Sequence, residues 1–174
     1  MSSVRPRRSA LATFVLAAGL IVTGCGTGAG AQTAQVYDAA AGSNSRGGDV
    51  EVHNALFVDN ANETATLSAA LLNKSEASET LTGVAVLNSD GEPVETTLSE
   101  PIELKPDTLY AAGKIAEVLV SGTNFEAGNF LTVTFTFSDA AEIAIDVPVV
   151  VRNEMYDNIA ETPKTSVTEE TASE

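Results

Sequence analysis

The 174-residue sequence has little of the side-chain chemistry that enzymes and metal sites use, with one cysteine, one histidine and no tryptophan. A lone cysteine excludes an intramolecular disulfide, a paired redox motif and a cysteine zinc cluster. His53 is the single imidazole that could serve as the base of a hydrolytic triad. No glycine-rich loop has the spacing of a phosphate-binding motif. We therefore expect a protein that is not an enzyme and that carries no cofactor.

Basic residues are also scarce, because nine Lys and Arg stand against 24 Asp and Glu and give a formal net charge of −15. Three of the nine, Arg5, Arg7 and Arg8, lie close to the N-terminus. Their removal would leave a net charge of about −18, which repels nucleic acid and anionic lipid head groups. Acidity of this kind favours solubility. It excludes a nucleic-acid partner and is compatible with a basic protein partner.

The N-terminal apolar stretch, residues 10–22, is shorter than the roughly 20 apolar residues that a membrane-spanning helix needs. The basic segment before it and the small residues after it are typical of a secretory signal peptide. The segment ends in Val22, Thr23, Gly24 and Cys25, which resembles the lipobox of bacterial lipoproteins. That resemblance implies cleavage before Cys25 and a diacylglycerol on its thiol. The alternative is an ordinary signal peptide followed by a chance cysteine.

The composition then divides the chain into four segments. Residues 1–24 are the expected signal peptide, and residues 25–48 are the lipidated cysteine and a flexible tether rich in Gly, Ala, Ser and Thr. Residues 49–153 form the expected folded domain. Residues 154–174 are an acidic tail rich in Thr and Ser, which we expect to be disordered. Several acyl chains hold a protein on a bilayer durably, so we expect it on the extracytoplasmic face of the cell membrane.

Residues 49–153 alternate between apolar and polar side chains, which is typical of half-buried strands. Leu131, Val133, Phe135 and Phe137 alternate with threonines, and a similar period runs through residues 143–147. The period slips near Asn54, where we expect a β-bulge. Turn residues such as Asp90-Gly91 separate short strands at intervals that predict a sandwich or a barrel. The sequence therefore predicts an all-β domain of about seven to nine short antiparallel strands.

The second half of the domain resembles a known family. Residues 101–106 read Pro-Ile-Glu-Leu-Lys-Pro, residues 124–128 read Asn-Phe-Glu-Ala-Gly, and two alternating strands follow at 131–135 and 143–149. This order resembles the periplasmic copper chaperones of the PCu(A)C type, and with the lipobox it is most similar to the actinobacterial lipoprotein branch called LpqE. The resemblance implies a cupredoxin-like, immunoglobulin-like β-sandwich. It covers about residues 49 to 151.

The sequence departs from that family at the copper ligands. The resemblance implies two histidines and two methionines, one pair of them shortly after the Leu-Lys-Pro turn, but residues 109–117 contain neither type. The segment near residues 88–98, where the other ligands are expected, contains none either. Soft Cu(I) prefers thioether and imidazole ligands, and after Cys25 the chain offers only His53 and Met155. We therefore expect no metal site of the family type.

Three other groups of residues are candidates for a site. His53 could be a metal ligand or a pH-sensitive contact, although a surface histidine in an edge strand is the simpler interpretation. The loop containing Asp59, Asn60, Asn62 and Glu63 presents oxygens that calcium could bind, with a plain polar turn as the alternative.

The third candidate, a partner-binding surface at Tyr110, Gly113 and Lys114, occupies the place where the resemblance puts the metal. We expect Tyr110 to be exposed and Gly113 to be flexible there, and the alternative is that Tyr110 packs against the end of the sandwich. On this hypothesis, a charged substitution at Tyr110 leaves stability nearly unchanged and reduces the capture of a partner.

These observations favour a non-catalytic accessory module that is anchored to the membrane through Cys25 and binds another envelope protein. Similarity to the LpqE branch implies a place beside the respiratory chain, with the cytochrome bc1–aa3 oxidase assembly as the partner. The alternative is a copper metallochaperone of the PCu(A)C type, which the resemblance favours and the missing ligands oppose.

The lipobox generates a first prediction. Cys25→Ser removes the thiol that would carry the lipid, so the variant should be released from the membrane or fail to mature. Fractionation of cells that express the full chain measures this, with the wild-type chain as the control. A variant that stays membrane-bound and is processed normally would contradict the lipoprotein hypothesis.

Overall fold

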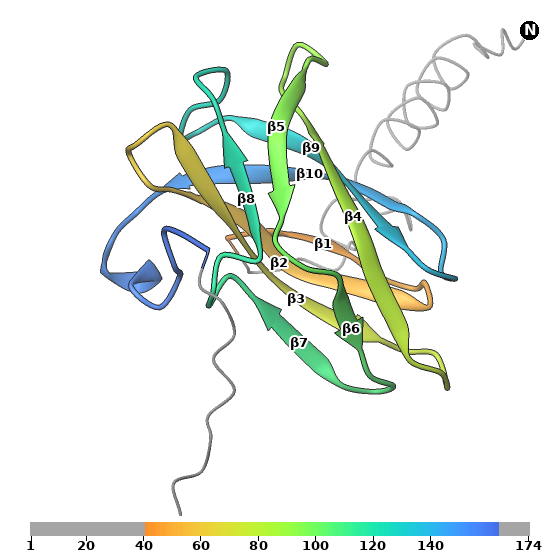
Figure 1. Cartoon of the computed structure of the whole chain (residues 1–174). Helices are drawn as coiled ribbons and strands as arrows, with labels where there is room; N and C mark the ends of the chain where they lie inside the picture. Colours follow the sequence, from red (N-terminus) through yellow and green to blue (C-terminus); the bar gives the residue numbers. More distant parts are fainter. Residues whose placement is uncertain (1–40, 164–174) are drawn as a thin grey trace, which may run out of the picture. The chain divides into compact units, whose positions relative to one another are not determined.

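The computed structural model describes residues 41–163, and these form strands and one short 3-10 helix (Figure 1). The predicted signal peptide, Cys25, most of the tether and the end of the tail lie outside the described residues. Within residues 41–163, no helix is long and apolar enough to cross a membrane. The elements are β1 (Ser43–Ser45), β2 (Val50–Asp59), β3 (Thr64–Asn73), β4 (Glu79–Leu87), β5 (Pro93–Leu98), β6 (Ile102–Leu104), β7 (Leu109–Ala112), β8 (Val118–Ser121), β9 (Phe130–Phe137), β10 (Ile143–Val151) and η3 (Glu154–Tyr156).

The strands form one closed, barrel-like sheet. Its order is β2-β10-β9-β4-β5-β8-β3, and β3 pairs back with β2, so that seven strands make a ring. Three short strands are added to it, β1 beside β2, β6 beside β4 and β7 beside β3 (Figure 1). The all-β prediction is confirmed. The expected sandwich of about seven to nine strands is observed as a barrel-like ring of seven strands with three short strands added. The ring forms because β3 pairs back with β2 and leaves no gap between two separate sheets.

One pairing corrects the expectation of a wholly antiparallel fold. The last residues of β10 run parallel to β2, with Val149 beside Phe57 and Val151 beside Asp59. The antiparallel ladder between β9 and β10 ends at Pro148, which faces Phe130. Proline has no N–H to donate to a ladder, so the ladder stops there and the end of β10 is free to join β2.

The alternation in β9 reflects its two environments. Leu131, Val133, Phe135 and Phe137 point into the barrel and are buried, while the threonines between them are partly exposed. Strand β2 shows no such period at its end, because Phe57 packs in the barrel while Leu56 and Val58 are buried on the outer side. The expected bulge is confirmed, since the register of β2 shifts between His53 and Leu56 and Asn54 has a φ of 50°.

The outer side of β2 is covered by a strap, which we define as residues 153–161. Ile159 packs on Leu56 and Val58. The backbone N–H of Ala160 donates to the carbonyl of Gly113 at 2.8 Å, and its carbonyl accepts from the hydroxyl of Thr66 at 2.7 Å. The expectation of disorder from residue 154 is therefore wrong for this part, because buried apolar side chains and satisfied backbone groups stabilise it.

The other predicted boundary also moves. Residues 43–45, which we expected in the flexible tether, form strand β1. The side-chain oxygen of Asn44 accepts from the backbone N–H of Asn54 at 2.9 Å, and the side-chain oxygen of Asn54 accepts from the N–H of Gly42 at 2.9 Å. These amide contacts hold the segment on β2 without any apolar period, which is why hydrophobicity does not reveal it.

A buried carboxylate ties the turn between β9 and β10 to the start of β4. Glu79 is 5% exposed and accepts backbone N–H groups from Ser138 at 3.0 Å and Ala140 at 2.6 Å. Burial raises the pKa of this carboxyl, but hydrogen bonds from Ser138, Thr80, Ala140 and Asp139 outweigh burial and lower the pKa to about 2. A lowered pKa stabilises the fold at neutral pH, and this contribution is lost as the pH falls below about 4 towards 2.

The packing of β9 generates a second prediction. Phe135 is fully buried, so Phe135→Ala should lower the free energy of unfolding by about 3–5 kcal/mol. Chemical denaturation of the full chain measures this change. Phe130→Ala is the matched control, because Phe130 lies on the same strand with 56% of its surface exposed and should lose less than about 1 kcal/mol. Equal losses in the two variants would contradict the observed phase of β9.

Candidate functional site

The structure places the predicted surface at Tyr110, Gly113 and Lys114 on and just after β7, which pairs with β3. Tyr110 is half-buried, and its hydroxyl donates to Oε1 of Glu117 at 2.9 Å. The backbone N–H of Gly113 donates to Oε2 of Glu117 at 2.7 Å. Glu117 is 4% exposed. Its carboxylate therefore ties both residues to the barrel, and Lys114 alone of the three is exposed.

This arrangement corrects two expectations. Tyr110 is not an exposed side chain, and burial together with the charge of and hydrogen bond to Glu117 raises the pKa of its phenol to about 12. Gly113 is buried and held, with a φ of 107°, and a Cβ there would lie 2.9 Å from the carbonyl oxygen of Leu67. A negative charge at Tyr110 would meet buried Glu117, so on this geometry we expect such a substitution to lower the stability of the domain. Binding of a partner at this surface stays a prediction.

Glu117 is a residue that sequence reasoning missed. It stands between Ala116 and Val118, which are both buried. A charged residue between two apolar neighbours in a strand-rich segment is ordinarily assigned to the solvent face. The one available indication was the nearby tyrosine, because a phenol is a common partner for a buried carboxylate.

The donor atoms at this place do not fit Cu(I). Phenol and carboxylate oxygens are hard ligands, whereas Cu(I) prefers sulfur and imidazole, and Tyr110 and Glu117 are already bonded to each other. His53 lies on β2, with its Nε2 3.1 Å from Oε2 of Glu51, and Met155 is 74% exposed in η3. Across residues 41–163, no group of three or more His, Cys, Asp or Glu side chains is placed to hold a metal.

In the acidic loop after β2, the side-chain oxygens accept hydrogen bonds from neighbouring protein groups. Asp59 accepts the backbone N–H of Ala61 at 2.8 Å, and Asn62 accepts the hydroxyl of Thr64 at 2.6 Å. The side-chain oxygen of Asn60 accepts from the guanidinium of Arg152. These oxygens are occupied by donors from the loop, from the start of β3 and from Arg152 just after β10, which is the arrangement of a polar turn.

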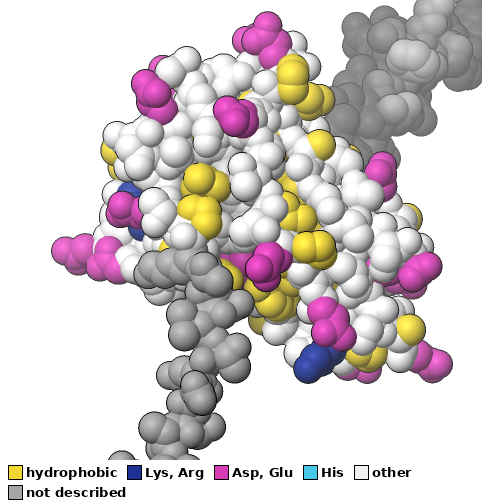
Figure 2. Space-filling model, in the orientation of Figure 1, with side chains coloured by type: hydrophobic (Ala, Val, Ile, Leu, Met, Phe, Trp, Pro, Cys, Tyr) yellow, Lys and Arg dark blue, Asp and Glu magenta, His cyan; other side chains and the backbone are white. Residues whose placement is uncertain are grey.

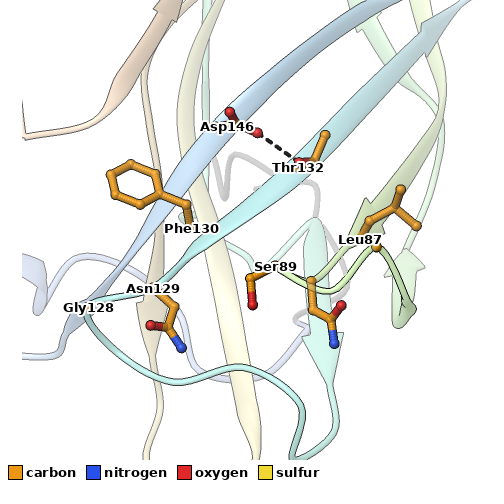
Figure 3. Close-up of a pocket in the computed structure, with 9 residues that line it drawn as sticks. Leu87, Ser89, Gly128, Asn129, Phe130, Thr132 and Asp146 are labelled. Carbon is orange, nitrogen blue, oxygen red and sulfur yellow. Dashed lines mark hydrogen bonds between the residues drawn. The ribbon is translucent and has the colours of Figure 1, made fainter.

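Two of the hollows that residues 41–163 line bear on the site. The smaller, about 140 Å³, brings His53 and Lys114 together beside Asn158 of the strap. The larger, about 500 Å³, lies where the β4–β5 turn meets the start of β9 and the middle of β10 (Figure 3). We call it the end hollow, and its lining comprises Leu87, Asn88, Ser89, Gly91, Gly128, Asn129, Phe130, Thr132 and Asp146.

Both turns that border the end hollow are held by hydrogen bonds. The side-chain oxygen of Asn88 accepts the backbone N–H groups of Asp90 at 3.0 Å and Glu92 at 2.8 Å. On the other side, the N–H of Gly128 donates to the carbonyl of Val149 at 2.8 Å, with a φ of 97° at Gly128 that favours glycine. The end hollow is therefore bordered by ordered turns.

The side chains of the end hollow combine apolar and acidic groups. Phe130 is 56% exposed and Leu87 is 39% exposed, and Figure 3 shows them on opposite sides with Ser89 between them. Asp146 is exposed, and its Oδ1 accepts the hydroxyl of Thr132 at 2.7 Å. Sequence reasoning missed this site, although the phase of β9 indicates it. Leu131 faces inward, so the neighbouring Phe130 faces outward.

The Tyr110–Glu117 contact generates a third prediction. Tyr110→Phe removes one of the two groups that donate hydrogen bonds to the buried carboxylate of Glu117, so the free energy of unfolding at neutral pH should fall by about 1–3 kcal/mol. Tyr156→Phe is the matched control, because its hydroxyl makes no hydrogen bond within residues 41–163 and Tyr156 is also half-buried. Thermal or chemical unfolding of the full chain measures both. No loss in Tyr110→Phe would show that Glu117 is satisfied without the phenol.

Comparison with known proteins identifies the fold. No protein-family model matches the chain, and no curated protein matches it. Among solved structures, it is similar to the copper-bound PCuAC domain from PmoF2, at 18% identity with a TM-score of 0.51, over 63% of this chain and 99% of that one. It is also similar to the apo PCuAC domain from PmoF1, at 16% identity with a TM-score of 0.52, over 63% of this chain and all of that one. At such identities the likeness concerns the fold alone: the barrel-like domain has the fold of PCuAC domains.

Proposed function

We propose that this protein is a non-catalytic, lipid-anchored accessory module of the bacterial envelope that acts by binding another protein. One observation carries the proposal. The chain has the fold of copper-binding PCuAC domains, yet a Tyr110–Glu117–Gly113 hydrogen-bond network fills the stretch where the family resemblance puts a ligand pair. A scaffold that lacks soft donors at that place and presents an ordered end hollow is suited to recognition by contact.

The anchor and the location belong to the same proposal. The lipobox at Val22-Thr23-Gly24-Cys25 supports a diacylglycerol on Cys25 and a position on the extracytoplasmic face of the cell membrane. The similarity of the sequence to the LpqE branch supports the cytochrome bc1–aa3 oxidase assembly as the partner. An anchored module searches for membrane complexes within a thin layer, which raises its effective concentration beside them.

A copper metallochaperone is the second candidate, and the fold of the copper-bound PmoF2 domain is the observation that favours it. The donor set opposes it. A Cu(I) site needs two or three soft ligands that converge at one point. His53 is paired with Glu51, and Met155 lies in η3. An enzyme is not supported, because the one histidine has no nucleophile among its described contacts.

A pair of measurements on the full chain separates the candidates and makes the fourth prediction. Titration with Cu(I) in competition with a chromogenic chelator should show no tight equivalent, because the described residues supply no convergent soft ligands. Purification of the tagged protein from detergent-solubilised membranes should enrich subunits of the respiratory oxidase over a control lipoprotein with the same tag. Tight binding of one Cu(I) equivalent would favour the chaperone hypothesis. Purification that enriches no envelope protein would contradict the accessory-module hypothesis.

A further inference from the structure

The end hollow has the chemistry of a protein-contact surface. Two large apolar side chains, Phe130 and Leu87, are exposed at its sides, and polar groups lie between them (Figure 3). Exposed aromatic residues beside polar groups are typical of the residues that dominate protein interfaces. The apolar side chains would gain from burial against a partner, and Asn129 and Ser89 can exchange hydrogen bonds with its backbone.

The hollow is ordered before any partner arrives. Asn88 closes one bordering turn with bonds to Asp90 and Glu92, and Gly128 ties the other turn to Val149. Phe130 is anchored at the base by its place in the β9–β10 ladder opposite Pro148. Little conformational freedom is therefore lost when a partner binds, which favours affinity.

The charge of the hollow selects the partner. Asp146 is its one charged lining residue, and Asp90 and Glu92 lie in the turn beside it. The lining contains no Lys or Arg. In the whole chain, acidic residues outnumber basic ones by 24 to nine, and the face in Figure 2 shows scattered Asp and Glu side chains with few Lys or Arg side chains among them. A positively charged partner is attracted to such a surface.

We propose that the end hollow binds a basic segment of an envelope protein. In this complex an aliphatic or aromatic side chain of the partner packs between Phe130 and Leu87, and an arginine or lysine pairs with Asp146. The inference deepens the proposed accessory function and rests on it, because it names the surface and the chemistry of the partner.

Charge argues against the other occupants. A second copy of this chain brings a net charge of −15 to a chain of the same charge. The segment beyond the described residues, 164–174, brings Glu169, Glu170 and Glu174 against one lysine. Anionic lipid head groups and nucleic acid are repelled for the same reason. A basic protein segment is the occupant whose charge complements Asp146.

The fifth prediction tests the surface with defined probes. A synthetic peptide of alternating arginine and leucine is titrated into the isotopically labelled full chain and followed by NMR. Amide signals of residues 87–91 and 128–132 should shift and saturate, and added salt should weaken binding. Asp146→Asn should raise the Kd about two- to fivefold, and Phe130→Ala about fivefold or more. A peptide of alternating glutamate and leucine should not bind.

Two matched controls make the result specific. Glu142→Gln removes the same charge from the same outer side of the β9–β10 hairpin, where Glu142 accepts the hydroxyl of Thr136 as Asp146 accepts that of Thr132. Leu109→Ala truncates another side chain that is 56% exposed, on β7. Neither control should change the Kd. Shifts spread evenly over the acidic surface, or equal weakening by Glu142→Gln, would overturn the proposal.

A second measurement separates this inference from the proposed function. Asp146→Asn and Phe130→Ala are introduced into the tagged full chain, and capture of oxidase subunits from solubilised membranes is compared with the wild type. Reduced capture by both variants, with normal capture by Glu142→Gln, supports the surface. Normal capture by all variants would contradict the proposal that the end hollow binds the partner, but it would not contradict the accessory function. If the wild-type chain enriches no envelope protein at all, the accessory function itself is overturned.

Discussion

The domain depends on the parallel pairing between the end of β10 and the end of β2. Val149 to Val151 lie beside Phe57 to Asp59, and this short ladder closes seven strands into a ring. Without it, β2 and β10 would both present a free edge, and unpaired edges invite association with other chains. The closure also places Val149 where its backbone can hold the turn at Gly128. Both the barrel core and the end hollow therefore depend on the same pair of strand ends.

A chain with few cations needs another means of stabilising its buried carboxylates. Glu79 is surrounded by backbone N–H groups of the β9–β10 turn, and Glu117 by the phenol of Tyr110 and the N–H of Gly113. Hydrogen bonds to an ionised acceptor are stronger than those between neutral groups. Glu79 joins the start of β4 to the turn after β9, and Glu117 joins the residue before β8 to β7 and the glycine that follows it. The acidic composition is thus part of the internal construction and extends beyond the surface.

Local patterns could be predicted from the sequence, and non-local contacts could not. The alternation of β9 and the bulge at Asn54 follow from the period of apolar residues, which is a property of neighbours in the chain. Strand β1 and the strap depend on single side chains such as Asn44 and Ile159 that meet distant partners. The parallel closure joins residues at the two ends of the domain. At the candidate site, Tyr110 packs against the core and bonds to Glu117, whose inward direction no period indicates.

The strap is the first described segment that a pull on the C-terminal end would meet. Arg152 donates to the carbonyls of Tyr156 and Ile159, and Ala160 bonds to Gly113 and Thr66. A force applied to the chain beyond the strap reaches these bonds and the side chain of Ile159 before it reaches β10. The strap would detach from the outer side of β2 first, and the freed residues would extend while the ring of strands stays closed. The strands that form the end hollow are in this way isolated from tension that enters through the C-terminal end.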